Sequence, residues 1–183
     1  MFQVRIHGRG GQGVVTAAEL LSVAAFDEGR HAQAFPTFGS ERTGAPVVAF
    51  CRIDERPIRS REPIAEPDAL FGQDPTLLHQ IDLFAGLTDS GLVLLNSTRS
   101  LDELGLAGTR FRTVTLPATD IAREHLGRPV PNAVLLGGFA ALTGVVSLDS
   151  VIAAIQEKFP GVVGERNAAA ARVAYAQLEP AHA

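Results

Sequence analysis

The chain has 183 residues, of which 46% are hydrophobic and 20% are charged, and its formal net charge at pH 7 is −4. This length predicts a single domain over residues 1–183 with a frayed tail at 179–183, and the composition excludes a disordered or collagen-like chain. The mildly acidic charge balance argues against nucleic acid as the main partner.

The longest apolar stretch, residues 133–146, is interrupted by glycines and by Thr143, and it is shorter than the roughly 18 residues that a membrane span needs. The N-terminal sequence MFQVRIHGRG lacks the basic region, apolar region and cleavage site of a secretion signal. We therefore expect a cytoplasmic protein with no membrane partner.

Cysteine and histidine usage limits the redox and metal chemistry. Cys51 is the single cysteine of the sequence, so this chain cannot supply the four thiolates that an iron–sulfur cluster usually requires. The five histidines show no metal-ligand spacing, and no carboxylate or nucleophile lies close to His7 in the sequence. We expect neither a metal site nor a catalytic residue in this chain, and any redox centre must come from elsewhere.

The N-terminal third has the pattern of an α/β unit. Residues 2–7 alternate apolar and polar side chains and run into glycines, which predicts a strand followed by a turn. Val14, Ala18, Leu21 and Ala25 then recur at helical spacing, which predicts a helix over residues 14–28. Two more strands are expected at residues 31–35 and 47–53.

The remainder continues as mixed strands and helices. Strands are expected at residues 69–71, 92–96 and 112–116, and helices at 75–86, 118–126, 132–142, 148–158 and 165–177. This order predicts the α/β fold class: a single three-layer, Rossmann-like domain with a mainly parallel central sheet and helices on both faces. Ligands are then expected outside the carboxyl ends of the strands.

A glycine-rich loop joins the first strand to the first helix. Gly8, Gly10 and Gly13 fit the pattern G-x-G-x-x-G, in which backbone N–H groups and a helix N-terminus can hold a phosphate. The same glycines could instead serve only a tight turn and close packing. A dinucleotide site also needs an acidic residue at the end of the second strand, where this sequence reads Phe35-Pro36-Thr37, so a phosphate ligand fits better than NAD.

Three blocks of the sequence resemble the gamma subunit, or gamma domain, of the 2-oxoacid:acceptor oxidoreductases, of the pyruvate and 2-oxoisovalerate:ferredoxin type. The first block is IHGRGGQG at residues 6–13, followed by Thr16 and Ala17. The second is AFP at 34–36 with GSERTGAPV at 39–47. The third is LPATDIA at 116–122 with LGRP at 126–129 and NAVLLG at 132–137, so the resemblance covers nearly the whole chain.

This resemblance implies a subunit of an enzyme that decarboxylates a 2-oxoacid oxidatively and passes the acyl group to coenzyme A. In the family, thiamine diphosphate with Mg2+ lies between the alpha and beta subunits, and [4Fe–4S] clusters are carried by a delta subunit. Electrons usually leave to ferredoxin, and some relatives add a flavin subunit that reduces NAD. The gamma chain holds none of these groups, and the isolated chain is expected to be inactive.

The resemblance also implies that the gamma chain contacts coenzyme A. The candidate residues are Arg9, Gly10, Gly11, Gln12, Gly13, Ser40, Arg42 and Thr43. Arg42 is the preferred phosphate ligand because a guanidinium can bind a phosphate bidentately, and a salt bridge with Glu41 or with a neighbouring subunit is the alternative. Ser40 and Thr43 could instead cap a turn. A purely structural subunit with an empty glycine loop and a free-standing NAD(P)-binding enzyme are the competing hypotheses.

Three other residues have structural roles in this interpretation. His7 is expected to be packed and to shape the turn, and Cys51 is expected to be an inert residue of the core. Asn132 follows two prolines and precedes an apolar helical run, which predicts the N-cap of a helix.

Overall fold

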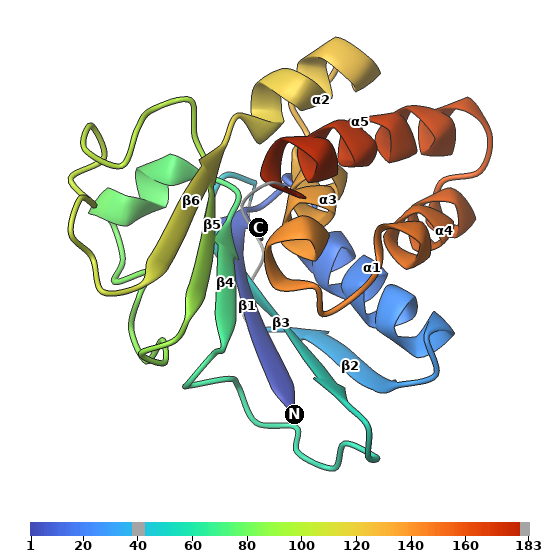
Figure 1. Cartoon of the computed structure of the whole chain (residues 1–183), viewed down its shortest axis with the longest axis horizontal. Coiled ribbons are helices and arrows are strands. Elements are labelled where there is room, and N and C mark those ends of the chain that lie inside the picture. Colours follow the sequence, from blue (N-terminus) through green and yellow to red (C-terminus); the bar gives the residue numbers. More distant parts are fainter. Residues whose placement is uncertain (38–42, 180–183) are drawn as a thin grey trace.

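The computed structural model describes residues 1–37 and 43–179 of the chain. Its described residues form a six-stranded sheet in the order β2-β3-β1-β4-β5-β6 (Figure 1). The strands are β1 (Phe2–Arg9), β2 (His31–Pro36), β3 (Pro46–Asp54), β4 (Ala69–Gly72), β5 (Leu92–Asn96) and β6 (Arg112–Leu116). Strands β1, β4, β5 and β6 pair in parallel, whereas β3 is antiparallel to both β1 and β2.

Helices cover both faces of this sheet. The α-helices are α1 (Val14–Asp27), α2 (Ala118–Leu126), α3 (Asn132–Thr143), α4 (Leu148–Lys158) and α5 (Val162–Leu178), and Pro75–His79 is the 3-10 helix η1. All five α-helices lie on one side of the sheet, and η1 lies on the other (Figure 1). The predicted three-layer α/β fold class is confirmed. The layer on the η1 side of the sheet is thin, whereas the α-helices form a full layer on the other side. In the predicted frayed tail, Glu179 is the C-cap residue that follows α5, and residues 180–183 lie outside the described part.

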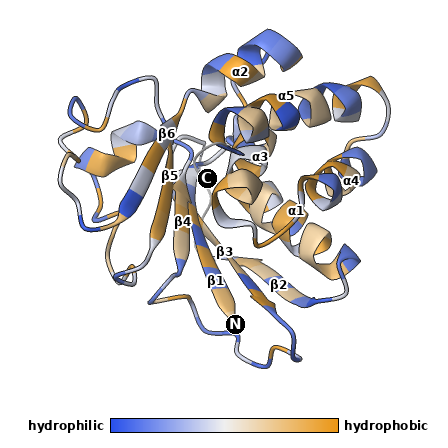
Figure 2. Ribbon diagram, viewed as in Figure 1, coloured by the Kyte–Doolittle hydropathy of each residue, from blue (hydrophilic) through white to orange (hydrophobic). Residues whose placement is uncertain are grey.

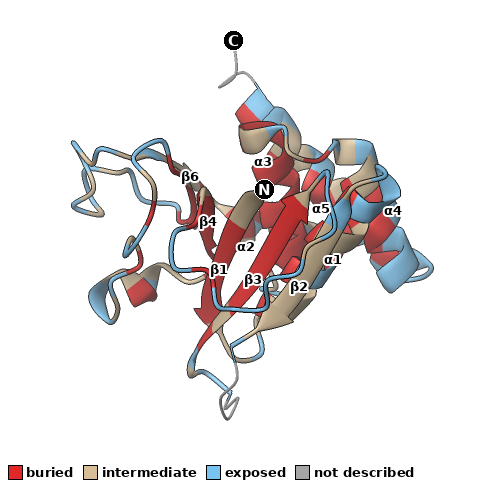
Figure 3. Cartoon of the chain, turned by 90° about the horizontal axis from the view of Figure 1, so that it is seen from below, coloured by how far each residue is buried: buried red, intermediate tan, exposed pale blue. Residues whose placement is uncertain are grey.

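The alternation of side chains along the strands divides the core into two. Val4, Ile6, Phe71 and Leu94 pack under the α-helices, whereas Leu70, Val93 and Leu95 pack with Leu77 and Leu83 on the η1 side. The period of two in each strand produces this division. Figure 3 shows β1 and β3 as largely buried strands.

Helix α3 is buried on all sides, as its uniformly apolar sequence indicates. Gly137 is the point of closest approach to α5, because a Cβ atom there would overlap the carbonyl oxygen of Ala171. The backbones of the two helices can therefore meet only where a side chain is missing. None of the helices in the described ranges combines the length and the apolar character that spanning a bilayer requires.

The helix predicted over residues 75–86 is wrong beyond its first turns, because η1 ends at His79. Arg5, a buried residue of β1, determines the path of the segment that follows. Arg5 donates from Nη2 to the carbonyl oxygens of Leu83 (2.9 Å) and Ala85 (2.6 Å), so these carbonyls serve a tertiary contact. The local helical tendency of the segment is overridden by this packing.

Candidate functional site

The parallel strands direct their carboxyl ends to one edge of the sheet, and the candidate site lies there. The glycine loop follows β1, Asp74 lies just after β4, and Asn96 ends β5. Helices α1 and α2 begin directly after the loops that leave β1 and β6. This is the edge at which open α/β sheets bind ligands.

The glycine loop leaves backbone donors free at the start of α1. Gly13 is the N-cap residue of α1 with a φ of 73°, and no side chain caps this helix. The first helical hydrogen bond runs from the Ala17 amide to the Gly13 carbonyl oxygen (2.9 Å), so the amides of residues 14–16 have no intrahelical acceptor. Unpaired N–H groups and the helix dipole together attract an anion.

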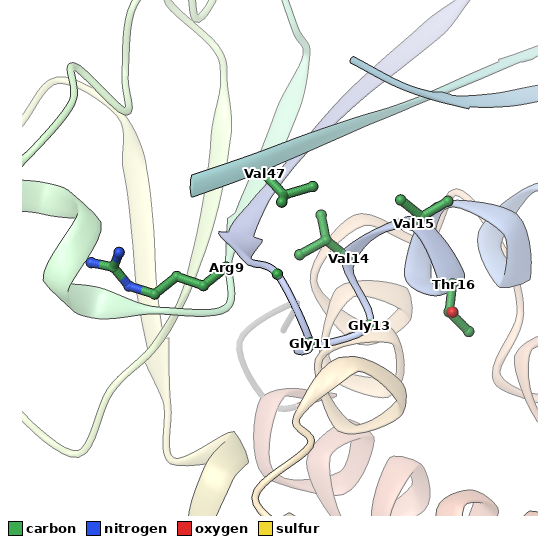
Figure 4. Close-up of a pocket in the computed structure, with 8 residues that line it drawn as sticks. Arg9, Gly11, Gly13, Val14, Val15, Thr16 and Val47 are labelled. Carbon is green, nitrogen blue, oxygen red and sulfur yellow. The ribbon is translucent and has the colours of Figure 1, made fainter. Parts of the chain in front are cut away.

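A hollow of about 180 Å³ lies against these amides (Figure 4). Its lining combines the loop, the first turn of α1 and the start of β3: Arg9, Gly10, Gly11, Gly13, Val14, Val15, Thr16 and Val47. In Figure 4 the side chain of Arg9 points away from the glycines, toward η1. The hollow is therefore formed mainly by backbone and small or aliphatic side chains.

Asp74 holds the two long polar side chains of the loop. Its Oδ2 accepts hydrogen bonds from Arg9 Nε (3.1 Å) and from Gln12 Nε2 (3.0 Å), while Gln12 Oε1 accepts from the Arg9 amide (2.7 Å). Arg9 Nη2 also donates to Thr76 Oγ1 (2.7 Å) and to Gln80 Oε1 (3.0 Å). The side chains of Arg9 and Gln12, both predicted ligand contacts, are thus engaged within the protein.

The surroundings of Asp74 favour the ionised form of its carboxyl. Burial acts to raise the pKa of its carboxyl, but the hydrogen bonds from Thr76 and Gln12 and the charge of Arg9 outweigh burial, so the pKa is lowered. Sequence reasoning missed Asp74 as a site residue. The available signal was its place directly after a strand, followed by proline and threonine, which is typical of a capping aspartate.

The second motif block meets the first at this loop. The Gly10 amide donates to the Ala45 carbonyl oxygen (2.9 Å), the Gly44 amide donates to the Gly10 carbonyl oxygen (3.1 Å), and Thr43 is bridged to Gly10. Thr43 is exposed at the rim of this junction. Ser40 and Arg42, the other candidates of this block, lie outside the described residues.

Asn132 supports the glycine loop from α3. Its side chain is 4% exposed, its Nδ2 donates to the Gly13 carbonyl oxygen (3.4 Å), and its Oδ1 accepts from the Ala133 amide (2.9 Å). The predicted N-cap role is wrong, because Pro131 is the N-cap and Asn132 is the first helical residue. The position of Asn132 between the starts of α1 and α3 could not be predicted from the sequence.

His7 and Cys51 are packed inside the protein, as predicted. His7 Nε2 accepts from Arg5 Nε (2.9 Å), and burial together with the Arg5 charge lowers the pKa of the imidazole to about 3. Cys51 is fully buried in β3, and burial raises the pKa of its thiol to about 12. His7 is therefore neutral at pH 7, and Cys51 remains a thiol. Within residues 1–37 and 43–179, no group of three or more potential ligand side chains could hold a metal ion.

The class that this fold and site define is an α/β domain with a glycine loop at the carboxyl edge of the parallel strands of a mixed sheet. The chain belongs to the pyruvate ferredoxin/flavodoxin oxidoreductase family, whose pattern matches residues 3–177. It is 51% identical over 179 residues to the pyruvate synthase subunit PorC of Methanothermobacter thermautotrophicus, covering 98% of this chain and 97% of that protein. It is 49% identical over 181 residues to the pyruvate/ketoisovalerate oxidoreductases common subunit gamma of Pyrococcus furiosus, covering 98% of each.

Solved structures share the fold. The pyruvate oxidoreductase subunit PORC of Thermotoga maritima superposes with a TM-score of 0.83 at 35% identity, covering 96% of this chain and 95% of that one. The 2-oxoglutarate:ferredoxin oxidoreductase of Magnetococcus marinus, solved with 2-oxoglutarate, coenzyme A and succinyl-CoA, gives a TM-score of 0.79 at 19% identity over 98% of this chain and 31% of that chain. At that identity the likeness concerns the fold alone.

Proposed function

We propose that this chain is the gamma subunit of a multisubunit, thiamine diphosphate-dependent 2-oxoacid:ferredoxin-type oxidoreductase, and that its glycine loop binds the phosphates of coenzyme A. Two relatives that are 51% and 49% identical to this chain are named as a subunit of pyruvate synthase and as the common gamma subunit of pyruvate/ketoisovalerate oxidoreductases, which supports the subunit assignment. The free amides at the start of α1 support the phosphate role.

The complex would convert a 2-oxoacid and coenzyme A into acyl-CoA, CO2, one proton and two electrons. Thiamine diphosphate with Mg2+ and the [4Fe–4S] clusters would lie in the alpha, beta and delta subunits, which supply the decarboxylation and carry the electrons. The residues of this chain do not fit an iron–sulfur cluster, because its single cysteine is buried as a thiol in β3. Among the described residues no group of three or more potential ligand side chains fits a metal ion. Its own contribution is binding and orientation of coenzyme A, together with surface for assembly in the cytoplasm.

The loop would bind phosphate in two ways. Amides of Gly11 and Gly13 and of the first turn of α1 supply hydrogen bonds, while Gly10, whose own amide donates to Ala45, lines the hollow. The hydroxyls of Ser40 and Thr43 add donors from the second block. Arg42 supplies the charge, since it belongs to the block whose described end contacts Gly10. Arg9 and Gln12 hold the loop in shape through Asp74.

Arg42→Ala in the assembled complex tests this proposal. Loss of one charge-assisted contact removes about 1.5–3 kcal/mol, so the KM for coenzyme A should rise roughly ten- to hundredfold while that for the 2-oxoacid changes little. Arg59→Ala, at an exposed arginine far from the loop in sequence, is the matched control. An unchanged coenzyme A dependence in an intact complex would show that Arg42 has a structural role.

The occupation of Arg9 and Gln12 by internal partners favours a second candidate, a structural subunit whose loop binds nothing. It predicts that the Arg42 variant and the wild type share one KM for coenzyme A. The free-standing NAD(P) enzyme is disfavoured by topology. In this sheet the antiparallel strand β3 separates β2 from β1, so β2 does not end beside the glycine loop as in a dinucleotide-binding sheet.

A further inference from the structure

A second hollow lies at the start of α5, away from the glycine loop. Leu126, Arg128, Val162, Val163 and Arg166 line it, and we call it the valine hollow. Val162 and Val163 are 60% and 56% exposed, which places both among the few large apolar side chains open to solvent on the described surface. Figure 2 shows the turn between α4 and α5 as an apolar stretch at the outer end of the helical layer.

The exposure of these valines is built into the fold. A Cβ atom at Gly164 would overlap the carbonyl oxygen of Phe159, so the turn is packed tightly against the end of α4. Asn167, 5% exposed, donates from Nδ2 to the Val163 carbonyl oxygen (2.9 Å) and fixes the first turn. An apolar pair held outward on a rigid turn loses little conformational entropy when it binds.

The charged side chains that line the hollow have one sign. Arg128 and Arg166 are exposed, and neither has a hydrogen bond or an ion pair with any described residue. No side chain caps the N-terminus of α5, so its amides add partial positive charge; Glu165, in the first turn, does not line the hollow. A surface this basic on a chain of net charge −4 is complementary to carboxylates.

We propose that the valine hollow is a docking site for a segment of a partner subunit that presents an apolar side chain between carboxylates. The apolar side chain would cover Val162 and Val163, and the carboxylates would pair with Arg128 and Arg166. This inference rests on the proposed role as a subunit, but it uses none of the residues assigned to coenzyme A. Assembly and coenzyme A binding therefore remain separately measurable.

Charge reversal in the co-expressed complex tests the docking site. In the double variant Arg128→Glu/Arg166→Glu, the apparent dissociation constant of this chain for the rest of the complex should rise at least tenfold. In the wild type, added salt should weaken the same association. Arg172→Glu, an exposed arginine of the same helix outside the hollow, should leave assembly unchanged. Thermal unfolding of each full-length variant controls for folding.

A photo-crosslinking amino acid at position 163 identifies the occupant within the purified complex. The crosslink should reach one segment of a partner subunit with Asp or Glu beside an apolar residue, whereas the same probe at Phe26, which is 70% exposed, should not reach that segment. Full retention of the double variant at all salt concentrations would overturn the proposal. So would a crosslink only between two copies of this chain. An unchanged KM for coenzyme A in the Arg42 variant would overturn the loop assignment alone.

Discussion

Gly11 and Gly13 share a left-handed backbone but differ in their surroundings. Their φ angles are 91° and 73°. A Cβ atom at Gly11 would meet nothing within 4 Å, whereas one at Gly13 would lie 2.5 Å from Asn132 Nδ2. The close packing at Gly13 therefore involves Asn132 of α3. Substitutions at the two positions therefore distinguish an effect on loop packing, at Gly13, from an effect on ligand contact, at Gly11.

Gly13→Ala should destabilise the protein more than Gly11→Ala. Both substitutions incur the left-handed backbone cost of about 1–2 kcal/mol, and Gly13→Ala adds roughly 1–3 kcal/mol of overpacking against Asn132. Urea unfolding measures the difference. Gly105→Ala, with a φ of 71° and open space around it, is the control for the backbone cost alone. Gly11→Ala should also raise the KM for coenzyme A, because Gly11 lines the hollow. Equal stabilities of the Gly13 and Gly105 variants would contradict the packing argument.

Asp74 links the stability of the loop to pH. A carboxyl whose pKa is lowered by folding contributes stability above its ordinary value of 3.8, and that contribution is lost as the pH falls through the lower pKa of the folded state. Asp74→Asn should therefore lower the free energy of unfolding by about 1.5–3 kcal/mol at pH 7, and the difference from wild type should shrink below about pH 4. Chemical unfolding across this range measures it, with Asp102→Asn at an exposed site as the control. A difference that stays constant down to pH 2 would argue against an ionised Asp74 in the network.

At the scale of elements, the contact of α3 with α5 depends on Gly137. A methyl group there would meet the Ala171 backbone, whereas a Cβ at Gly138 would meet the ends of flexible side chains, Leu116 Cδ2 at 2.9 Å and Leu178 Cδ1 at 3.2 Å. Gly137→Ala should thus cost about 3 kcal/mol or more, and Gly138→Ala clearly less. Thermal unfolding of the two variants compares them, and equal melting temperatures would refute the close approach.

Most elements could be predicted because their patterns are local. The alternation in β1 and the helical spacing in α1 each indicate the element without reference to the rest of the chain. The segment after Pro75 could not be predicted, because Arg5 lies far from Leu83 in sequence and its contact with that carbonyl replaces a helical hydrogen bond. The start of α5 was placed too late, at residue 165, since an exposed pair of valines does not resemble the amphipathic first turn of a surface helix.

The candidate site was predicted in part for the same reason. A glycine loop between a strand and a helix is a contiguous signal, so its position at the carboxyl edge could be inferred. Asp74 and Asn132 support the loop from two other elements, and only the folded chain brings them to Arg9 and to Gly13. The family resemblance supplied the connection of Thr43 to the loop, which no local pattern indicates.

At the scale of the whole molecule, this chain should depend on its partners for all redox chemistry. The purified chain alone should contain no stoichiometric iron and should not reduce ferredoxin or a viologen dye with any 2-oxoacid, because its one thiol is buried and its pKa is raised to about 12. The co-purified complex is the positive control. Iron analysis and dye reduction measure both, and turnover by the pure chain would overturn the subunit assignment.

The burial of α3 also affects the order in which the chain can become stable during synthesis. The six strands of the described chain are complete before residue 132, yet the helix that packs on Phe71 and Leu94 belongs to the last third of the sequence. A nascent chain that has just finished β6 therefore carries a sheet whose apolar face is covered by α1 along β1, β2 and β3 but still lacks α3 over Phe71 and Leu94. That face attracts chaperones and aggregation partners until α3 emerges from the ribosome.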